Sequence, residues 1–243
     1  MKGSENPDLD TALLSGVPMA VMAAHELKAP LALIRQLSLA LESGDISPEE
    51  KERLSRQITL VSERALRLTT DLTRAARLED SLFELEPLNP QQICEEVAHE
   101  LTPLYRARGK KIHVSSRYRP ILAVANRDLL RRILLNFADN ALHYVSTATP
   151  VELFTLTREY GSHIRLGVRD YGPQIPANTW QMIERNLGTG KQSLHVRPQS
   201  SGLGLFIAGQ FARAMQGSVG ATRHRNGATF YVDVSASNQL RLL

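Results

Sequence analysis

The spacing of the hydrophobic residues changes near Glu84, and this change divides the chain into two parts of different structure. Before it, apolar residues recur every three or four positions, which is the spacing of amphipathic helices. After it, helical stretches near Pro90–Arg106 and Arg127–Tyr144 alternate with short runs typical of half-buried strands. These runs are Lys111–Ser116, Leu122–Ala125, Val151–Arg158, His163–Asp170 and Thr229–Val234. A chain of 243 residues is long enough for two such domains. We therefore predict a helical domain at residues 11–80 and an α+β domain at residues 86–236.

The first part is predicted to form two helices joined by a short turn. The first helix is expected at Leu13–Leu41 and contains Pro30, which either kinks the helix or marks its boundary. The residues of the turn, Ser43–Ile46, interrupt the helical pattern. The second helix starts directly after them, with Ser47 at the N-cap position and Glu50 as the reciprocal capping residue.

The second helix carries a heptad seam. Its apolar residues follow one another at alternating steps of four and three, and this pattern needs a partner helix with a similar seam. Two helices in a hairpin form only half of a four-helix bundle, so we predict a homodimer. The alternative is a hairpin that packs on the second domain of its own chain. The seam residues are Leu54, Ile58, Val61, Ala65, Leu68, Leu72 and Ala75.

The composition is that of a globular protein without disulfides. Hydrophobic residues make up 42% of the chain and charged residues 22%, which is enough to build a buried core. Cys94 is the only cysteine, so an intrachain disulfide and a cysteine-ligated zinc site are excluded, and we expect a buried thiol. The formal net charge is +4 and no basic run is interleaved with aromatics. We therefore expect a surface that meets an anionic nucleotide rather than nucleic acid.

The sequence contains no membrane-spanning or secretory segment. No apolar stretch reaches the roughly 18 residues of a membrane span, and the N-terminal residues lack the charged and apolar regions of a signal peptide. We therefore expect a cytoplasmic protein. The alternative is that this chain is the inner part of a longer, membrane-anchored protein.

In the second domain, a helix predicted at Arg127–Tyr144 carries polar residues on one face. Asn136 and Asn140 lie one turn apart, and His143 or Tyr144 follows on the same face. Asparagine is unfavourable inside helices, so two aligned asparagines need a reason. Their amide oxygens suit Mg²⁺, which prefers oxygen ligands and bridges substrate phosphates. The alternative is a pair of solvated or locally bonded side chains.

Two later segments suit other parts of a nucleotide. Asp170 leaves a predicted strand at a tight turn, where its carboxylate can accept a hydrogen bond from an exocyclic amine such as that of adenine. A simple turn aspartate is the alternative. Gly202 and Gly204 come at the start of an apolar helix, whose free N–H groups and dipole favour a phosphate. The polar segment at residues 188–201 is expected to form a mobile lid over a triphosphate.

His25 lies in the first predicted helix and begins the sequence HELKAPL. A lone helical histidine is usually inert, but the adjacent Glu26 changes this expectation. A neighbouring carboxylate can hold the imidazole tautomer and raise its nucleophilicity. The pair therefore favours phosphoryl transfer onto His25. The residue one turn further along is Ala29, which has no group to position a water.

The segment that begins at His25 closely resembles the phosphoacceptor box of two-component sensor histidine kinases. Later segments follow in the order of that family: an N box at Asn136–Tyr144, an Asp-Gly box at Asp170–Ile175, a glycine box at Gly202–Leu205 and a final strand at Gly227–Phe230. The resemblance covers nearly the whole chain. It implies a dimerisation and histidine-phosphotransfer hairpin, followed by an α+β sandwich ATP-binding domain of the Bergerat type shared with gyrase, Hsp90 and MutL.

The resemblance also implies roles for single residues. His25 would be the phosphorylated nucleophile and Glu26 its base or orienting group. ATP would be the phosphoryl donor, and Asn140, with Asn136 nearby, would hold Mg²⁺. The phosphoryl group would then pass to an aspartate of a response-regulator receiver domain. The remaining nucleotide contacts implied by the family are His143, Tyr144, Asp170, Gly172, Gly202, Leu203, Gly204 and Thr229.

The sequence departs from the family pattern at several positions. Ala29 stands where a Thr or Asn is thought to position water for dephosphorylation, so we expect weak or absent phosphatase activity. Gln174 replaces a second glycine, and Ile183 and Asn186 replace aromatics of the lid. These changes allow an alternative function, a catalytically weak dimeric scaffold that regulates another kinase. Asn136 stands where hydrolytic relatives carry a water-activating Glu, which favours a kinase over an ATPase.

Overall fold

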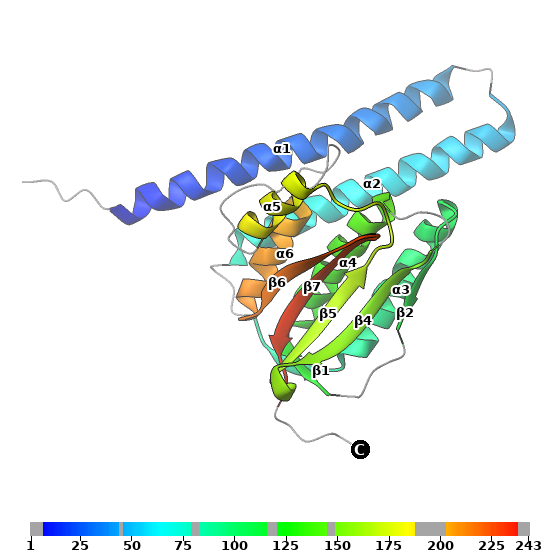
Figure 1. Ribbon diagram of the computed structural model, residues 1–243. Coiled ribbons are helices and arrows are strands. Elements are labelled where there is room, and N and C mark those ends of the chain that lie inside the picture. The colour runs from blue at the N-terminus through cyan, green and yellow to red at the C-terminus, as the bar shows by residue number, and fades with distance from the viewer. Residues whose placement is uncertain are drawn as a thin grey trace, which may run out of the picture. The chain divides into compact units, whose positions relative to one another are not determined.

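A computed structural model describes residues 7–43, 46–78, 83–115, 121–144, 149–187 and 203–237 (Figure 1). The chain divides into two compact units between Ala76 and Arg77. The boundary predicted from the sequence, between residues 80 and 86, lies a few residues further along. Within the described part of the chain, no helix combines the length and the apolar character that a membrane span requires.

The first unit is a pair of helices that lie side by side (Figure 1). α1 runs from Pro7 to Glu42 and α2 from Pro48 to Ala76. α1 continues without interruption through Pro30, so the interpretation of this proline as a helix boundary is wrong. The four-helix bundle of a dimer stays a prediction.

α2 begins at the predicted cap. Ser47 Oγ accepts the N–H of Glu50 at 3.2 Å, and the carbonyl of Ser47 accepts the N–H of Lys51 at 2.9 Å. Glu50 does not act as the reciprocal cap that the sequence predicts, because its two carboxylate oxygens accept from Arg53. A guanidinium at this spacing offers two charged donors, whereas the N-cap backbone offers one neutral N–H.

The second unit is an α/β sandwich built on a five-stranded mixed sheet (Figure 1). The strand order is β2-β4-β5-β7-β6, in which β2 runs parallel to β4 and all other neighbours are antiparallel. β1 and β3 form a separate antiparallel pair. The strands are β1 Glu86–Leu88, β2 Ile112–Val114, β3 Ala123–Ala125, β4 Val151–Arg158, β5 His163–Arg169, β6 Ser218–His224 and β7 Gly227–Ser235.

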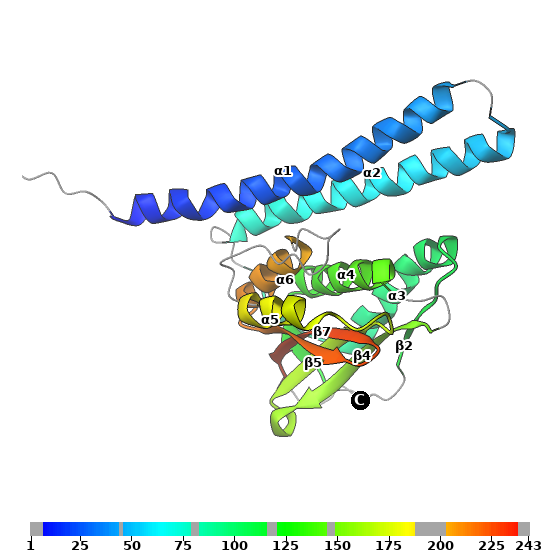
Figure 2. The same cartoon turned by 45° about the horizontal axis from the view of Figure 1, so that its top comes forward.

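A layer of helices covers one face of this sheet (Figure 2). α3 contacts β4, α4 contacts β5 and β7, and α6 contacts β6. α4 also contacts both α3 and α6, so it is the middle helix of the layer. The helices of this unit are α3 Pro90–Ala107, α4 Arg127–Tyr144, α5 Ala177–Asn186 and α6 Leu203–Ala214.

Side-chain caps fix the start of α3 and of α4. Asn89 Oδ1 accepts the N–H of Gln91 at 3.0 Å, and Asn126 Oδ1 accepts the N–H of Leu129 at 3.1 Å. Each cap satisfies one of the backbone donors left free at a helix start.

The core lies between this helix layer and the sheet. Phe137 of α4 meets Phe230 of β7 with ring centroids 6.0 Å apart. Burying a large apolar side chain of this kind contributes about 1.5–3 kcal/mol. Cys94 of α3 is buried as predicted, and burial raises the pKa of its thiol to about 12. The largest fully buried side chains also include Tyr105, Phe211, Ile93, Leu129, Leu130, Ile133 and Leu134.

Candidate functional site

Asn136 and Asn140 lie on the side of α4 that faces the start of α6. A Cβ built on Gly204, the second residue of α6, would lie 3.8 Å from Asn140 Nδ2 and 3.9 Å from the Cβ and Cγ of Asn136. The buried Nδ2 of Asn136 has no hydrogen-bond partner in the described part of the chain. α4 therefore presents two amides to the first turn of α6, and that of Asn136 is incompletely bonded.

The residues around Gly204 are of a kind that suits a phosphate with its cation. A methyl group at Gly204 would make only ordinary van der Waals contacts, so the packing of the protein itself does not require glycine there. The backbone N–H groups in the first turn of a helix point toward its start, where they favour an anion. The asparagine amides on the opposite side supply oxygens of the kind that Mg²⁺ prefers.

The chemistry of the surrounding side chains is also informative. Within the described residues, no group of three or more His, Cys, Asp and Glu side chains is arranged to hold a metal ion. A cation at Asn140 would therefore be held by amide oxygens together with oxygens of its ligand. Mg²⁺ binds in this way when it accompanies a nucleotide, because it keeps several waters and bridges the phosphates.

Asp170 follows β5, and its side chain is 4% exposed. Its Oδ1 accepts the N–H of Gly172 at 3.0 Å and its Oδ2 accepts the N–H of Ala228 at 3.2 Å. Both oxygens are thus held by backbone donors from two segments. A carboxylate has about four acceptor positions in all.

Gly227 allows β7 to pass close to Asp170. It has φ +103°, and a Cβ at this position would lie 2.6 Å from Asp170 Oδ1 and closer still to the Asp170 carbonyl oxygen. Only glycine satisfies both conditions. Neither Gly227 nor Ala228 was among the predicted site residues. The backbone contact that joins Ala228 to Asp170 spans 58 residues and leaves no local signal.

Thr229 lies on the other face of β7 from Phe230. Phe230 points to the helix layer, where it meets Phe137, and successive strand residues point to opposite faces. The Thr229 hydroxyl lies 2.9 Å from His224 Nε2. Its predicted role in nucleotide binding stays a prediction, and the pairing register places Ala228, not Thr229, opposite Asp170.

Arg169 braces the turn that precedes Gly227. It donates to the side chain of Asn226 at 2.7 Å, and its guanidinium lies 4.4 Å above the ring of Tyr171. Burial, and then the nearby charge of Arg169, lower the pKa of His224, while Asp170 acts in the opposite direction. The strand end beside Asp170 is therefore held from several sides.

The remaining predicted nucleotide contacts lie around these groups. Gly172 is buried in the turn after Asp170, and Leu203 is the buried first residue of α6. His143 and Tyr144 end α4, but their side chains lie outside the described residues, as do Gly202 and the lid predicted at residues 188–201. Three residues of this unit depart from the family pattern. Gln174 is exposed, Ile183 is fully buried in α5, and the side chain of Asn186 lies outside the described residues.

His25 and Glu26 belong to the first compact unit, whereas Asn140 and Asp170 belong to the second. The backbone of His25 is helical within α1, and its side chain lies outside the described residues. Glu26 is half-buried, and Ala29, one turn after His25, is exposed. The chain thus separates its predicted nucleophile from its predicted nucleotide contacts in different units.

The chain resembles known proteins along most of its length. Residues 125–238 match the family of histidine kinase-, DNA gyrase B- and HSP90-like ATPases. Sensor histidine kinase YcbM of Bacillus subtilis (strain 168) is 27% identical, over 83% of this chain and 65% of its own. Sensor histidine kinase GlrK of Escherichia coli (strain K12) is 31% identical, over 81% of this chain and 41% of its own. This chain spans less than two thirds of the length of these relatives.

A solved structure shares the fold. Full-length ShkA, crystallised in complex with AMPPNP, is similar with a TM-score of 0.60 and 24% sequence identity. The similarity covers 93% of this chain and 47% of ShkA. The relatives named above are protein histidine kinases by name.

Proposed function

Because this chain belongs, by its ATPase domain and its relatives, to the sensor histidine kinases, we propose that it transfers the γ-phosphoryl group of ATP to His25. The main observation that supports this proposal is that one domain contains two half-sites suited to different parts of a nucleotide. The asparagine face of α4 meets the first turn of α6, and the Asp170 carboxylate is fixed beside β7. The first half-site suits phosphates with a cation, and the second suits a base that carries an amine.

Asp170 would accept a hydrogen bond from the exocyclic amine of adenine. Two backbone donors already fix its carboxylate, so no rearrangement of the group is needed when the base arrives. A base with a carbonyl at that position would set two acceptors against each other, which favours adenine over guanine. Gly172, Gly202, Leu203 and Gly204 would line the nucleotide beside it.

Asn140 would hold Mg²⁺, with Asn136 one turn away. Bound Mg²⁺ spreads the charge that develops on the triphosphate during transfer. The contribution of the chain is positioning, because α4 is held between α3 and α6 and presents both amides to the first turn of α6. His143, Tyr144 and Thr229 keep their predicted roles as further nucleotide contacts.

In the chemical step, a ring nitrogen of His25 attacks the γ-phosphorus in line with the bridging oxygen. The bond between phosphorus and that oxygen breaks, and ADP leaves. The imidazole proton passes to the Glu26 carboxylate or to water, and Glu26 also orients the ring. Transfer of this kind depends mostly on positioning and electrostatics. A response-regulator aspartate would then receive the phosphoryl group.

The hairpin would pair with a second copy to form a four-helix bundle. Large apolar side chains remain exposed on both of its helices in the single chain. Val21 and Leu31 of α1 are 54% and 59% exposed, and Leu66 of α2 is 68% exposed. Exposed apolar side chains that gather on one surface mark sites of protein–protein interaction. We place the dimer in the cytoplasm, alone or as the inner part of a longer, membrane-anchored protein.

Phosphatase activity toward the response regulator would be weak or absent. Ala29 lies one turn after His25 and is exposed, and its methyl side chain offers no group to orient a water. Replacing it with threonine, Ala29→Thr, should add regulator dephosphorylation without loss of kinase activity. An unchanged lifetime of the phosphorylated regulator would contradict the role assigned to Ala29.

The deciding experiment is phosphorylation of the full chain with Mg²⁺ and γ-labelled ATP. Wild type should acquire an acid-labile, base-stable label, and His25→Gln should lose it while still binding ATP. His113→Gln, at an exposed histidine of β2, is the matched control and should keep the label. Persistent acid-labile label on His25→Gln would overturn the proposal.

A second candidate function is a catalytically weak dimeric scaffold that regulates another kinase. Two departures from the family pattern favour it. Gln174, in the turn after Asp170, stands where a second glycine is usual, and Ile183, buried in α5, replaces an aromatic of the lid. Titration with ATP, with and without Mg²⁺, separates the two functions. Absence of binding by wild type would favour the scaffold.

A further inference from the structure

The turn that ends α3 makes two side-chain bonds to the backbone of α4. Tyr105 Oη donates to the carbonyl of Ala138 at 2.7 Å, and Lys110 Nζ donates to the carbonyl of Leu142 at 2.5 Å. These two carbonyls are one helical turn apart, and Asn140 lies midway between them in the sequence. Both bonds join residues more than thirty positions apart, so they are tertiary contacts and not part of either helix.

The backbone at the end of α3 places the Tyr105 and Lys110 side chains on the side that faces α4. The N–H groups of Arg108 and Lys110 both return to the carbonyl of Tyr105, at 3.1 and 2.8 Å. Gly109, between them, has φ +65°, a conformation that favours glycine. The chain therefore reverses tightly at the end of α3, and Lys110 comes to lie beside Tyr105 instead of one turn further along.

Packing alone does not explain why a tyrosine and a lysine occupy these two positions. The Tyr105 side chain is fully buried. Burial, together with the charges of Asp139 and Asp170, raises the pKa of its hydroxyl, which therefore stays a donor. Burial, and then Arg108, lower the pKa of the Lys110 amine. Phenylalanine and methionine would fill these positions without burying polar groups.

The end of α4 needs outside donors. The last four carbonyls of a helix have no intrahelical partner, and an unsupported last turn frays. Leu142 supplies one of these carbonyls, and Lys110 satisfies it. The opposite side of the same turn carries Asn140 toward Gly204. A shift of this turn would therefore move Asn140 relative to the first turn of α6.

We propose that Tyr105 and Lys110 are positioning residues of the phosphoryl-transfer site. They hold the last turn of α4 from the α3 side, so that the amide of Asn140 stays at the separation from α6 that Mg²⁺-ATP requires. They act through α4 and touch neither the nucleotide nor the cation. This inference rests on the proposed function.

The test measures ATP affinity of the full chain by calorimetry, with and without Mg²⁺, well below the unfolding temperature. Tyr105→Phe and Lys110→Met should each weaken Mg²⁺-ATP binding about fivefold, the factor expected for one lost hydrogen bond. Binding of ATP without Mg²⁺ should stay unchanged. Lys110→Arg keeps a donor at this position and should restore most of the affinity.

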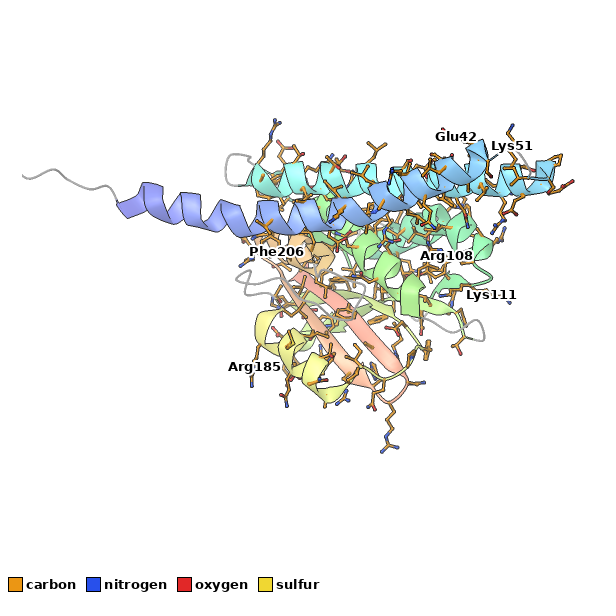
Figure 3. All side chains as sticks on the ribbon, turned by 90° about the horizontal axis from the view of Figure 1, so that it is seen from above. Glu42, Lys51, Arg108, Lys111, Arg185 and Phe206 are labelled. Atoms are coloured by element: carbon orange, nitrogen blue, oxygen red, sulfur yellow. The ribbon has the colours of Figure 1, made fainter. Side chains whose placement is uncertain are left out.

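Two control variants make the same substitutions at other residues. Tyr160→Phe removes a hydroxyl from a fully exposed tyrosine. Lys111→Met removes the amine next to Lys110. Lys111 lies in the same turn as Arg108 and is labelled in Figure 3; it is exposed and makes no side-chain bond within the described residues. Both controls should bind Mg²⁺-ATP like wild type.

The outcomes separate the inference from the function on which it rests. If wild type binds Mg²⁺-ATP and both variants bind it equally well, the inference is overturned and the kinase proposal stands. Equal losses with and without Mg²⁺ would also overturn it, because they indicate a general structural role. If Tyr105→Phe does not fold, Lys110→Met decides alone. If wild type binds no Mg²⁺-ATP, both proposals fail.

Discussion

The two halves of the candidate site differ in how much of their bonding the fold itself supplies. Each Asp170 oxygen accepts a backbone N–H, and Gly227 packs directly against the same carboxylate. On the other half, Asn136 Nδ2 is buried and has no partner within the described residues. Buried polar groups are usually paired. The fold therefore fixes the Asp170 carboxylate in place before a ligand arrives, whereas the asparagine half leaves a buried donor for a ligand to pair.

This difference predicts two kinds of mutational effect. Changes in the Asp170 half should weaken the fold and the binding of nucleotide together. Changes in the asparagine half should weaken binding and leave the free energy of unfolding unchanged or higher. Measuring both quantities on the same variants tests the distinction directly.

The largest effect is expected at Gly227. Gly227→Ala should lower the free energy of unfolding by about 3 kcal/mol or more, because it combines backbone strain with a clash against Asp170. Gly161→Ala is the matched control, since Gly161 has φ +98° but nothing within 4 Å of an added Cβ. It should lose only about 1 kcal/mol. Equal losses in urea unfolding would show that the contact with Asp170 is unimportant.

Asp170→Asn should have the next largest effect. The amide has the shape of the carboxylate, but its NH₂ group must face the N–H of either Gly172 or Ala228. One backbone donor then loses its acceptor inside the protein, at about 1–3 kcal/mol of stability. ATP binding, measured by calorimetry, should fall in the same variant. Unchanged stability would contradict the view that this half is preformed.

Gly204→Ala should separate stability from binding. Alanine is favoured over glycine inside a helix by about 0.5–1 kcal/mol, and the added methyl meets no close contact. The free energy of unfolding should therefore rise. The methyl would point at the amides of Asn136 and Asn140, so Mg²⁺-ATP binding should fall. A variant that gains stability and still binds normally would place the nucleotide elsewhere.

The smallest effect concerns His224, which lies behind the Asp170 half. Its folded-state pKa is lowered, first by burial and then by Arg169. The folded state thus favours the neutral ring, so this contribution to stability is present above the ordinary pKa of about 6.5 and is lost as the pH falls through the lowered value. His224→Gln should reduce the loss of stability on acidification. Parallel pH profiles of unfolding for variant and wild type would exclude this role.

Part of the fold follows from local patterns. The bounds predicted for α4 and for β4, Arg127–Tyr144 and Val151–Arg158, are confirmed, because both segments are long and strongly periodic. β6, at Ser218–His224, was missed because small and polar residues occupy most of its length. α5 was missed because it is short and follows two prolines. The parallel pairing of β2 with β4 depends on the chain path between them, which local periodicity does not encode.

The candidate site divides in the same way. Residues whose chemistry is unusual for their location, such as Asn136 in a helix interior or Asp170 after a strand, are visible in the sequence. The groups that bond to these residues and hold them in place cannot be identified from the sequence. Ala228 acts through its backbone N–H, which every residue type except proline offers. Tyr105 fits the apolar face of an amphipathic helix, and only the fold shows that its hydroxyl bonds to α4. Both contacts connect distant segments, so only the folded chain reveals them.

The strand order also determines when each strand can pair during synthesis of the chain. β5 can pair with β4 as soon as their hairpin has been made, but its other neighbour, β7, is made only after α5, α6 and β6. Translation proceeds at about 5–20 residues per second, so one edge of β5 stays unpaired for several seconds. This strand carries Ile164, Leu166 and Val168, and unpaired apolar edges promote aggregation. A nascent chain that stalls before Gly227 should therefore depend on chaperones, and release of β7 from the ribosome ends that dependence.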